Sequence, residues 1–257
     1  MNMDWIIAWR NLWRNPRRTA VILVSVVVGI WMMLFLGAIM WGMVQSMLRN
    51  SLANLTGHIQ VHHPDFFQDP ALDNRMGGIE TLREALEAAL PEGSRTAWRV
   101  RLETVAANAR HSGGFTLVGT DLGTAREMTF LGQAGIEGSL PGNDTPPNRI
   151  LVGKALLEDF ETAIGHKLIL TNRAADGEIR SRAFHISGSF DTPLESNETA
   201  FAFVRLEDAR DFLGIDKAIT ELSVMLPEIA STDAVARDLS GRLDPEQFRV
   251  STWRERA

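Results

Sequence analysis

The chain of 257 residues contains no cysteine. Disulfide bonds and thiolate zinc sites are therefore excluded, and an exported domain must rely on its hydrophobic core. The sequence also lacks the His-Glu-x-x-His helix of zinc proteases and the Gly-x-Ser-x-Gly turn of serine hydrolases. No pairing of a nucleophile with a base stands out. The sequence therefore predicts no enzyme, no catalytic residue, no metal ligand and no cofactor bound by this chain.

A long segment near the start lacks charge. No ionisable side chain occurs between Arg18 and Arg49, and nearly every residue from Ala20 to Val44 is apolar. A membrane-spanning helix needs about 20 apolar residues to cross roughly 30 Å of hydrocarbon. The apolar part of a secretory signal peptide is only about 7–15 residues long. The run therefore predicts a retained transmembrane helix over residues 19–48, and no second run of this kind occurs.

The flanking charges predict the orientation of this helix. The first 18 residues hold four arginines and one acid, Asp4, and so have a net charge of +3. The positive-inside rule places this end in the cytoplasm and residues after about 49 outside. Because the whole chain has a formal charge of −6, the remainder has −9. An acidic external domain argues against nucleic acid as a partner, since phosphates would be repelled.

Tryptophan and arginine recur at helical spacing before the apolar run. Tryptophan at headgroup level and arginine on the polar face are typical of a helix that lies on a membrane surface. Residues 1–18 are therefore predicted to form a cytoplasmic amphipathic elbow helix, with Pro16 marking the turn into the span. The alternative, compatible with the first, is that these residues simply anchor the spanning helix in lipid. The predicted anchors are Trp5, Trp9, Arg10, Trp13, Arg14, Arg17 and Arg18.

Small residues share one face of the predicted span. Ser25, Gly29 and Gly37 follow one another at helical spacing, and such residues let a second helix approach closely. We therefore predict a packing surface for a partner helix. The absence of charge within the span argues against an ion or proton pathway along it.

The rest of the chain alternates between strand and helix patterns, which indicates an α+β fold. Strand, helix and strand at both ends predict an α/β lobe made of residues 49–110 and 200–254, with residues 111–199 inserted as a β-rich lobe. Predicted strands cover residues 58–62, 100–108, 115–119, 150–152, 167–171, 182–190, 200–204, 221–226 and 248–251. Predicted helices cover residues 79–90, 155–164, 206–213 and 232–243, and a hairpin turn is expected at residues 112–114.

Histidines and glycines provide the remaining candidates for chemistry. On a strand that rises about 3.3 Å per residue, His58 and His62 lie roughly 13 Å apart, too far to share a zinc ion at about 2 Å from each nitrogen. We interpret them, and His63, as packing or surface residues. The pairs Gly119 with Gly123 and Gly153 with Lys154 lack the full pattern of a phosphate loop and are interpreted as turn glycines.

Several short motifs occur in a fixed order along the chain. They are WRNLWRNPRRT at 9–19, GHIQV at 57–61, ILVGKAL at 150–156, the strands at 184–190 and 200–206, and VSTWRE at 250–255. In this order they resemble the FtsX-like, MacB-type ABC transporter permeases, and most closely the lipoprotein-releasing LolC/LolE transmembrane subunits. One departure is Gly165-His166, where the family often has Gly-Asp. Another is that members of the family have three further membrane helices after this point. We expect the sequence to be a fragment, with a split subunit or a decayed copy as the alternatives.

The resemblance implies a fold and a function. It implies a porter-like α/β lobe with an inserted β-rich lobe, outside the cytoplasmic membrane of a bacterium. It implies that the chain is the N-terminal part of a transmembrane subunit that couples cytoplasmic ATP hydrolysis to the handling of an external substrate such as a lipoprotein. Expected partners are a cytoplasmic ABC ATPase that binds the ATP, a second permease copy or paralogue, and membrane lipid.

Two other classes of protein stay open at this point. The chain as written also fits a single-pass, membrane-anchored binding or scaffold module that works without an ATPase. A tethered extracytoplasmic hydrolase would need a pocket in which a buried histidine meets a carboxylate and a hydroxyl.

Overall fold

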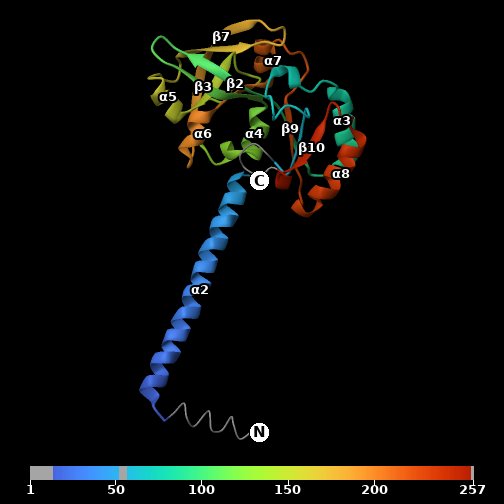
Figure 1. The fold of residues 1–257 in the computed structure, drawn as a ribbon. Coiled ribbons are helices and arrows are strands. Elements are labelled where there is room, and N and C mark those ends of the chain that lie inside the picture. The colour runs from blue at the N-terminus through green and yellow to red at the C-terminus, as the bar shows by residue number, and fades with distance from the viewer. Residues whose placement is uncertain (1–13, 52–56, 256–257) are drawn as a thin grey trace. The chain divides into compact units, whose positions relative to one another are not determined.

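The computed structural model describes the backbone of residues 14–51 and 57–255, and the side chains of residues 14–42 and 57–255 (Figure 1). The chain divides into two compact units, residues 1–50 and 51–257, which we describe separately.

One helix, α2 (Pro16–Ser51), accounts for nearly all of the described part of the first unit. It begins at Pro16, a residue favoured in the first turn because the N–H that it lacks needs no partner there. Its segment Pro16–Gly42 is long and apolar enough to cross a membrane, and within the described residues no other helix is. Trp31 and Met33 expose 74% and 79% of their surface. Such exposure suits lipid rather than water.

The first part of the second unit is a sheet in the order β10–β1–β9–β2 (Figure 1). Strand β1 (Ile59–His62) pairs antiparallel with β10 (Arg249–Thr252) on one side and with β9 (Glu221–Met225) on the other. The beginning of β2 (Arg95–Ala107) pairs with β9. Helices α3 (Ile79–Ala89) and α8 (Thr232–Arg242) contact each other beside this sheet. The shared core comprises Ile59, Val61, Leu82, Leu86, Leu222, Val224, Val235 and Leu239, among others.

The second part of this unit is a closed ring of strands. The end of β2 pairs with β3 (Ser112–Thr120), and the ring continues through β8 (Phe201–Arg205), β5 (Arg149–Gly153) and β7 (Ile179–Asp191). Strand β6 (Lys167–Arg173) pairs with both β7 and β2 and so closes the ring. Strand β4 (Gly135–Gly138) adds to β7. Because closure removes free strand edges, the ring protects itself against edge pairing.

The ring is filled with apolar side chains. All six of its strands contribute to one core, which also includes residues of α7 (Leu206–Leu213) and Leu156 of α5 (Lys154–Asp159). A smaller core lies on the opposite face of β3, β5, β7 and β8, where α4 (Leu122–Met128) packs. The predicted boundaries of two lobes stay a prediction. The side chains change from one main core to the other between Trp98 and Val100 in β2.

The predicted strands and helices are present, with differences in some bounds and three elements that were not predicted. The predicted turn at 112–114 belongs to β3, because Asn108 instead closes the hairpin with its side-chain oxygen, which accepts from the N–H groups of Arg110 and His111. Helix α5 ends at Asp159 rather than at residue 164, and Glu161 follows with a φ of 45°. Helix α4, strand β4 and helix α6 (Glu195–Ala200) were not predicted.

Candidate functional site

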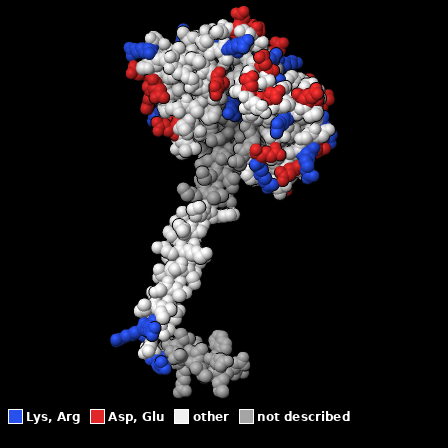
Figure 2. Space-filling model, viewed as in Figure 1, with Lys and Arg blue, Asp and Glu red and all other residues white. Residues whose placement is uncertain are grey.

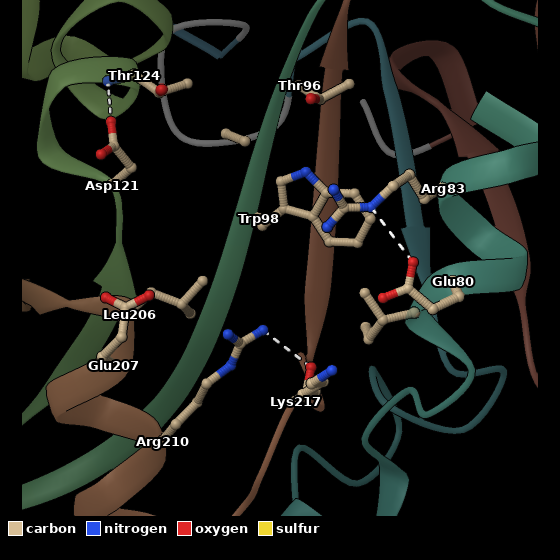
Figure 3. Close-up of a pocket in the computed structure, with 12 residues that line it drawn as sticks. Glu80, Arg83, Thr96, Trp98, Asp121, Thr124, Leu206, Glu207, Arg210 and Lys217 are labelled. Carbon is tan, nitrogen blue, oxygen red and sulfur yellow. Dashed lines mark hydrogen bonds and ion pairs between the residues drawn. The ribbon is translucent and has the colours of Figure 1, made fainter. Parts of the chain in front are cut away.

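Among the described side chains, Nε2 of His62 lies 3.4 Å from the hydroxyl of Ser251, but both residues are buried and neither lines the cleft described below. Within residues 14–42 and 57–255, no group of three or more His, Asp or Glu side chains is placed to hold a metal ion. A cleft of about 390 Å³ lies between α3 and α7 above β2 (Figure 3). In it the guanidinium group of Arg83 lies 5.7 Å from the ring centre of Trp98 and pairs with Glu80 at 3.8 Å. These contacts form a polar cleft, but they bring no nucleophile next to a base.

Arg210 borders the same cleft and is held by backbone carbonyls. Its Nη2 donates to the oxygen of Lys217 at 2.9 Å, and its Nε donates to the oxygen of Ala218 at 3.1 Å. Burial lowers the pKa of Arg210, while the charge of Glu207 acts in the opposite direction. Arg210 therefore fixes the loop after α7 and does not offer a reactive group.

The residues where the chain enters the first strand are tightly constrained. Gly57 has a φ of 64°, and a Cβ atom there would lie 2.9 Å from the backbone oxygen of Val224. Glycine is the residue that accepts both conditions without strain. The next residue, His58, donates its backbone N–H to that same oxygen of Val224 at 2.8 Å. The start of β1 is thereby fixed against β9.

His58 forms two further bonds, one through its side chain and one through its backbone. Its Nδ1 accepts from the backbone N–H of Leu226 at 3.0 Å, and its carbonyl oxygen accepts from the N–H of Trp253 at 3.1 Å. Burial lowers the pKa of this imidazole below its ordinary value of 6.5. His58 thus joins the first strand both to β9 and to the turn that follows the last strand.

The turn after the last strand, Trp253–Glu255, is fixed in its own right. The Nη1 of Arg254 lies 2.8 Å from Oδ2 of Asp233 at the start of α8, and the guanidinium group lies 5.3 Å from the ring centre of Trp253. Oε2 of Glu255 accepts from the N–H of Thr252 at 3.2 Å. Since Ile59 faces Thr252 in the sheet, the two ends of the second unit lie in neighbouring antiparallel strands.

A buried ionic layer lies on the face of this sheet opposite α3 and α8, because its residues alternate with those of the apolar core. Arg99 and Glu221 are both fully buried, with Nη1 and Oε1 3.1 Å apart. The Nη1 of Arg101 lies 3.4 Å from the other carboxylate oxygen, and Gln60 donates to Oε1 at 3.2 Å. Arg99 also donates to Oγ of Ser223 at 2.8 Å. The carboxylate of Glu221 therefore joins β1, β2 and β9.

Burial of the charges in this layer costs free energy that only their mutual pairing offsets. Burial lowers the pKa of Arg99, and the neighbouring charge of Glu221 opposes that shift. A buried charge that loses its partner destabilises a protein by about 3–5 kcal/mol. Strands β2 and β9 are therefore held in one register by charge as well as by backbone bonds, and the hydrogen bond from Gln60 adds β1 to them.

The predicted membrane residues lie in the first unit. Trp5, Trp9, Arg10 and Trp13 fall outside the described residues. Arg14, Arg17 and Arg18 are exposed around the start of α2, where Figure 2 shows basic side chains next to an uncharged helix. Their role as anchors stays a prediction.

The predicted packing face of α2 is open along the described chain. The hydroxyl of Ser25 donates to the backbone oxygen of Val21 at 2.8 Å, so it is satisfied within the helix. A Cβ atom built on Gly29 or Gly37 would meet nothing within 4 Å. The surface has room for a partner helix, and the packing role stays a prediction.

The structure shows the surroundings of two predicted histidines and of one predicted turn glycine. His58 and His62 are buried packing residues, one of the two roles expected for them. At Gly153, a Cβ atom would lie 2.1 Å from the backbone oxygen of Glu198, whose carboxylate accepts from the N–H groups of Ala155 and Thr192. Gly153 is therefore a close-approach glycine at the end of β5, directly before α5, rather than the predicted turn glycine.

The sequence patterns did not predict the buried ionic layer. Its only signal is the presence of charged residues at alternate positions of otherwise apolar strands, as in AWRVRL at 97–102 and ELSVML at 221–226. Such positions are ordinarily assigned to the solvated face of a strand. In this protein Arg99 and Glu221 are instead fully buried.

Comparison with known proteins places this fold. No curated protein sequence matches the chain. The extracellular domain of the noncanonic ABC-type transporter YknZ from Gram-positive bacteria is similar in structure, with 12% identity, a TM-score of 0.52, and 76% of this chain and 99% of that chain covered. The periplasmic region of MacB from Actinobacillus actinomycetemcomitans has 9% identity, a TM-score of 0.54, and coverage of 80% and 92%. At these identities the likeness shows the fold.

The sequence itself matches a family model. Residues 19–242 match the MacB-like periplasmic core domain, and the match confirms the resemblance to MacB-type permeases that the order of motifs predicted. Helix α2 supplies a candidate anchor ahead of the external domain. The chain therefore belongs to the family of the MacB-like periplasmic core domain, as a membrane-anchored protein with an extracytoplasmic domain.

Proposed function

We propose that this chain is the N-terminal part of a transmembrane subunit of a MacB/LolC/LolE-type ABC transporter. A cytoplasmic ATPase partner binds and hydrolyses ATP, and the external domain handles a substrate such as a lipoprotein. The observation that carries the proposal is the pairing of β1 with β10, which brings the two ends of the external domain into neighbouring strands. In the resembled family, membrane helices precede the first of these strands and follow the last.

A movement of the membrane helices would be transmitted to a rigid sheet through either end of the external domain. Strands β1, β9 and β2 share backbone ladders and the buried carboxylate of Glu221. Sliding β2 past β9 would break backbone bonds and leave charges unpaired, which is strongly unfavourable. Sliding β1 past β9 would break backbone bonds and the hydrogen bond from Gln60 to Glu221. The sheet, with α3 and α8 on it, therefore moves as a body. This rigidity suits a domain that converts movement in the membrane into movement outside it.

The first unit fits the same proposal. Arg14, Arg17 and Arg18 would stay on the cytoplasmic side, with the nearby tryptophans at the headgroups, and would hold the N-terminus inside. The face made by Ser25, Gly29 and Gly37 would pack against a helix of a second permease copy or of a paralogue. Since α2 contains no charge within its apolar span, the substrate would be handled at the external surface rather than passed along this helix.

Co-purification tests the proposal. The full-length protein, tagged and extracted from membranes with mild detergent, should retain an ABC ATPase and a second permease subunit. The double variant Gly29→Leu/Gly37→Leu should lower the yield of the second permease, because leucine side chains keep the helices apart. The matched control Val24→Leu/Val27→Leu adds bulk to the opposite face and should leave the yield unchanged.

The outcomes separate the alternatives. A stable protein that retains no ATPase under any mild condition would refute the transporter assignment and would favour the membrane-anchored binding module. Equal yields from the glycine variant and its control would refute the packing face alone.

A further inference from the structure

We propose that His58 is a positioning residue whose neutral ring holds the first strand against β9 and whose protonation releases it. The proposal rests on the proposed function, because it makes the attachment of β1, the strand that pairs with β10, to the end of β9 sensitive to pH. It concerns the regulation of that site and adds no chemical step.

The hydrogen bond to Leu226 fixes the protonation state of the ring. A backbone N–H can only donate, so Nδ1 of His58 must present a lone pair at 3.0 Å from the nitrogen of Leu226. The ring is then neutral, with its proton on Nε2. Protonation would place a second N–H on Nδ1, facing the N–H of Leu226. The bond would be replaced by two opposed donors.

His62 has the opposite requirement, although it lies on the same face of the same strand. Its Nδ1 lies 2.8 Å from the carbonyl oxygen of His63, which can only accept, so this nitrogen carries a proton. Its Nε2 lies 3.4 Å from the hydroxyl of Ser251, which fits either protonation state. The hydrogen bond from His62 to His63 therefore does not depend on a bare ring nitrogen, whereas the bond from Leu226 to His58 does.

The surroundings of His58 add to this sensitivity. Burial lowers its pKa. The bond from Leu226 would raise the pKa only if the ring were the donor; because the backbone donates, the bond favours the neutral ring as well. Among the described residues, no ion pair joins His58 to an acid that would stabilise its charged form. The charged or titratable groups on β1, β9, β10 and the last turn are His62, Glu221, Arg249, Arg254 and Glu255. Glu221 bonds to Arg99 and Arg101, Glu255 accepts from the N–H of Thr252, and Arg254 pairs with Asp233 of α8.

Release at this point would loosen both ends of the external domain. The carbonyl of His58 accepts from Trp253 at the last turn, and its N–H is bound to Val224. A rotation of His58 away from Leu226 therefore disturbs the junction of β1, β9 and the last turn together. The expected effect is a higher rate of local opening at this junction in acid.

Hydrogen exchange of the full-length protein in lipid nanodiscs measures this opening at the amides of Leu226 and Trp253. After correction for intrinsic exchange, protection should fall as the pH decreases from 7.5 to 5. The ring of the open state titrates near 6.5, so the fall is at most about 30-fold, and it reaches that value if the closed state stays neutral at pH 5.

Three variants distinguish positioning from simple packing. In His58→Asn the side-chain oxygen replaces Nδ1 as an acceptor that does not titrate, so protection should persist at pH 7.5 and should no longer depend on pH. In His58→Ala protection should be low at every pH. The control His166→Asn removes an exposed histidine and should keep the wild-type pH profile. A wild-type profile that does not change with pH, or a His58→Asn profile that equals the wild type, would overturn the proposal.

A second measurement requires no variant. The ¹⁵N chemical shifts of the His58 ring in the wild-type protein should show a bare Nδ1 and a protonated Nε2 at pH 7.5. The reverse tautomer, or a charged ring, would also overturn the proposal.

The readouts also separate this proposal from the proposed function. Hydrogen exchange and chemical shifts can be measured without an ATPase. If they show the expected pH dependence while no ATPase co-purifies, His58 would be a positioning residue in a protein that is not a transporter subunit. If the complex forms, its ATPase activity should fall less steeply in acid for His58→Asn than for the wild type. Identical pH profiles would remove His58 from the coupling and leave the transporter assignment intact.

Discussion

Replacing Glu221 by glutamine should destabilise the external domain strongly. The substitution preserves size but removes the negative charge that lies 3.1 Å from the fully buried Arg99. Arg99 would then be a buried cation without its carboxylate, a situation that raises the free energy of the folded state by about 3–5 kcal/mol. Arg101 would suffer less, because 32% of its side chain is exposed and water can solvate it. Most of the loss is therefore assigned to Arg99.

Urea denaturation of the full-length protein in detergent, followed by circular dichroism, measures this difference. The control is Glu207→Gln, which removes the same charge from an exposed position and should change stability by less than about 1 kcal/mol. The double variant Arg99→Met/Glu221→Leu removes both buried charges and should recover most of the loss, since an apolar pair of similar volume avoids desolvation. A single-variant loss below about 1 kcal/mol, or a double variant less stable than the single one, would contradict the reasoning.

Three further substitutions test other contacts. Gly153→Ala places a Cβ atom 2.1 Å from the backbone oxygen of Glu198 and should destabilise the domain by about 1–3 kcal/mol in the same assay. Arg254→Ala removes an ion pair whose side chains are 58% and 56% exposed, so the expected loss is below about 1 kcal/mol and should shrink further in high salt. The lowered pKa of His58 means that the unfolded state binds more protons below pH 6.5. Stability should therefore decrease as the pH falls from 6.5 through the folded-state pKa, and His58→Asn should flatten that part of the curve.

The elements predicted well are those whose pattern depends on local chemistry. Helix α2 follows from the absence of charge between Arg18 and Arg49, and the strands follow from alternation or from continuous apolar runs. Closure of the ring could not be predicted in this way. It depends on β6 pairing with β2, where Thr171 faces Val105, and local patterns carry no information about such distant partners.

The ionic layer shows where the alternation rule fails. In β1 the residues Gln60 and His62 alternate with Ile59 and Val61, which predicts a half-buried strand with one polar, solvated face. All four residues are in fact buried, because further parts of the chain cover the polar side. The pattern identified the two faces correctly but did not reveal that both are covered. The burial of Arg99 in strand β2 of the same sheet shows that the polar face of this sheet is covered.

A polar layer at this place has a consequence that an apolar one would lack. A slip of β1 by one residue would move Gln60 and His62 to the side of α3 and α8, since side chains alternate between the two faces. An apolar layer would tolerate that slip more easily, because one aliphatic side chain can replace another. The slip would also break the hydrogen bond from Gln60 to Glu221 and would bury the amide of Gln60 and the imidazole of His62 among apolar side chains, which is unfavourable for polar groups. The register of β1 against β9, and through β10 the separation of the two chain ends, is therefore fixed to a single residue. A domain that receives force at those two ends needs such a fixed separation, because slack between the strands would absorb the movement.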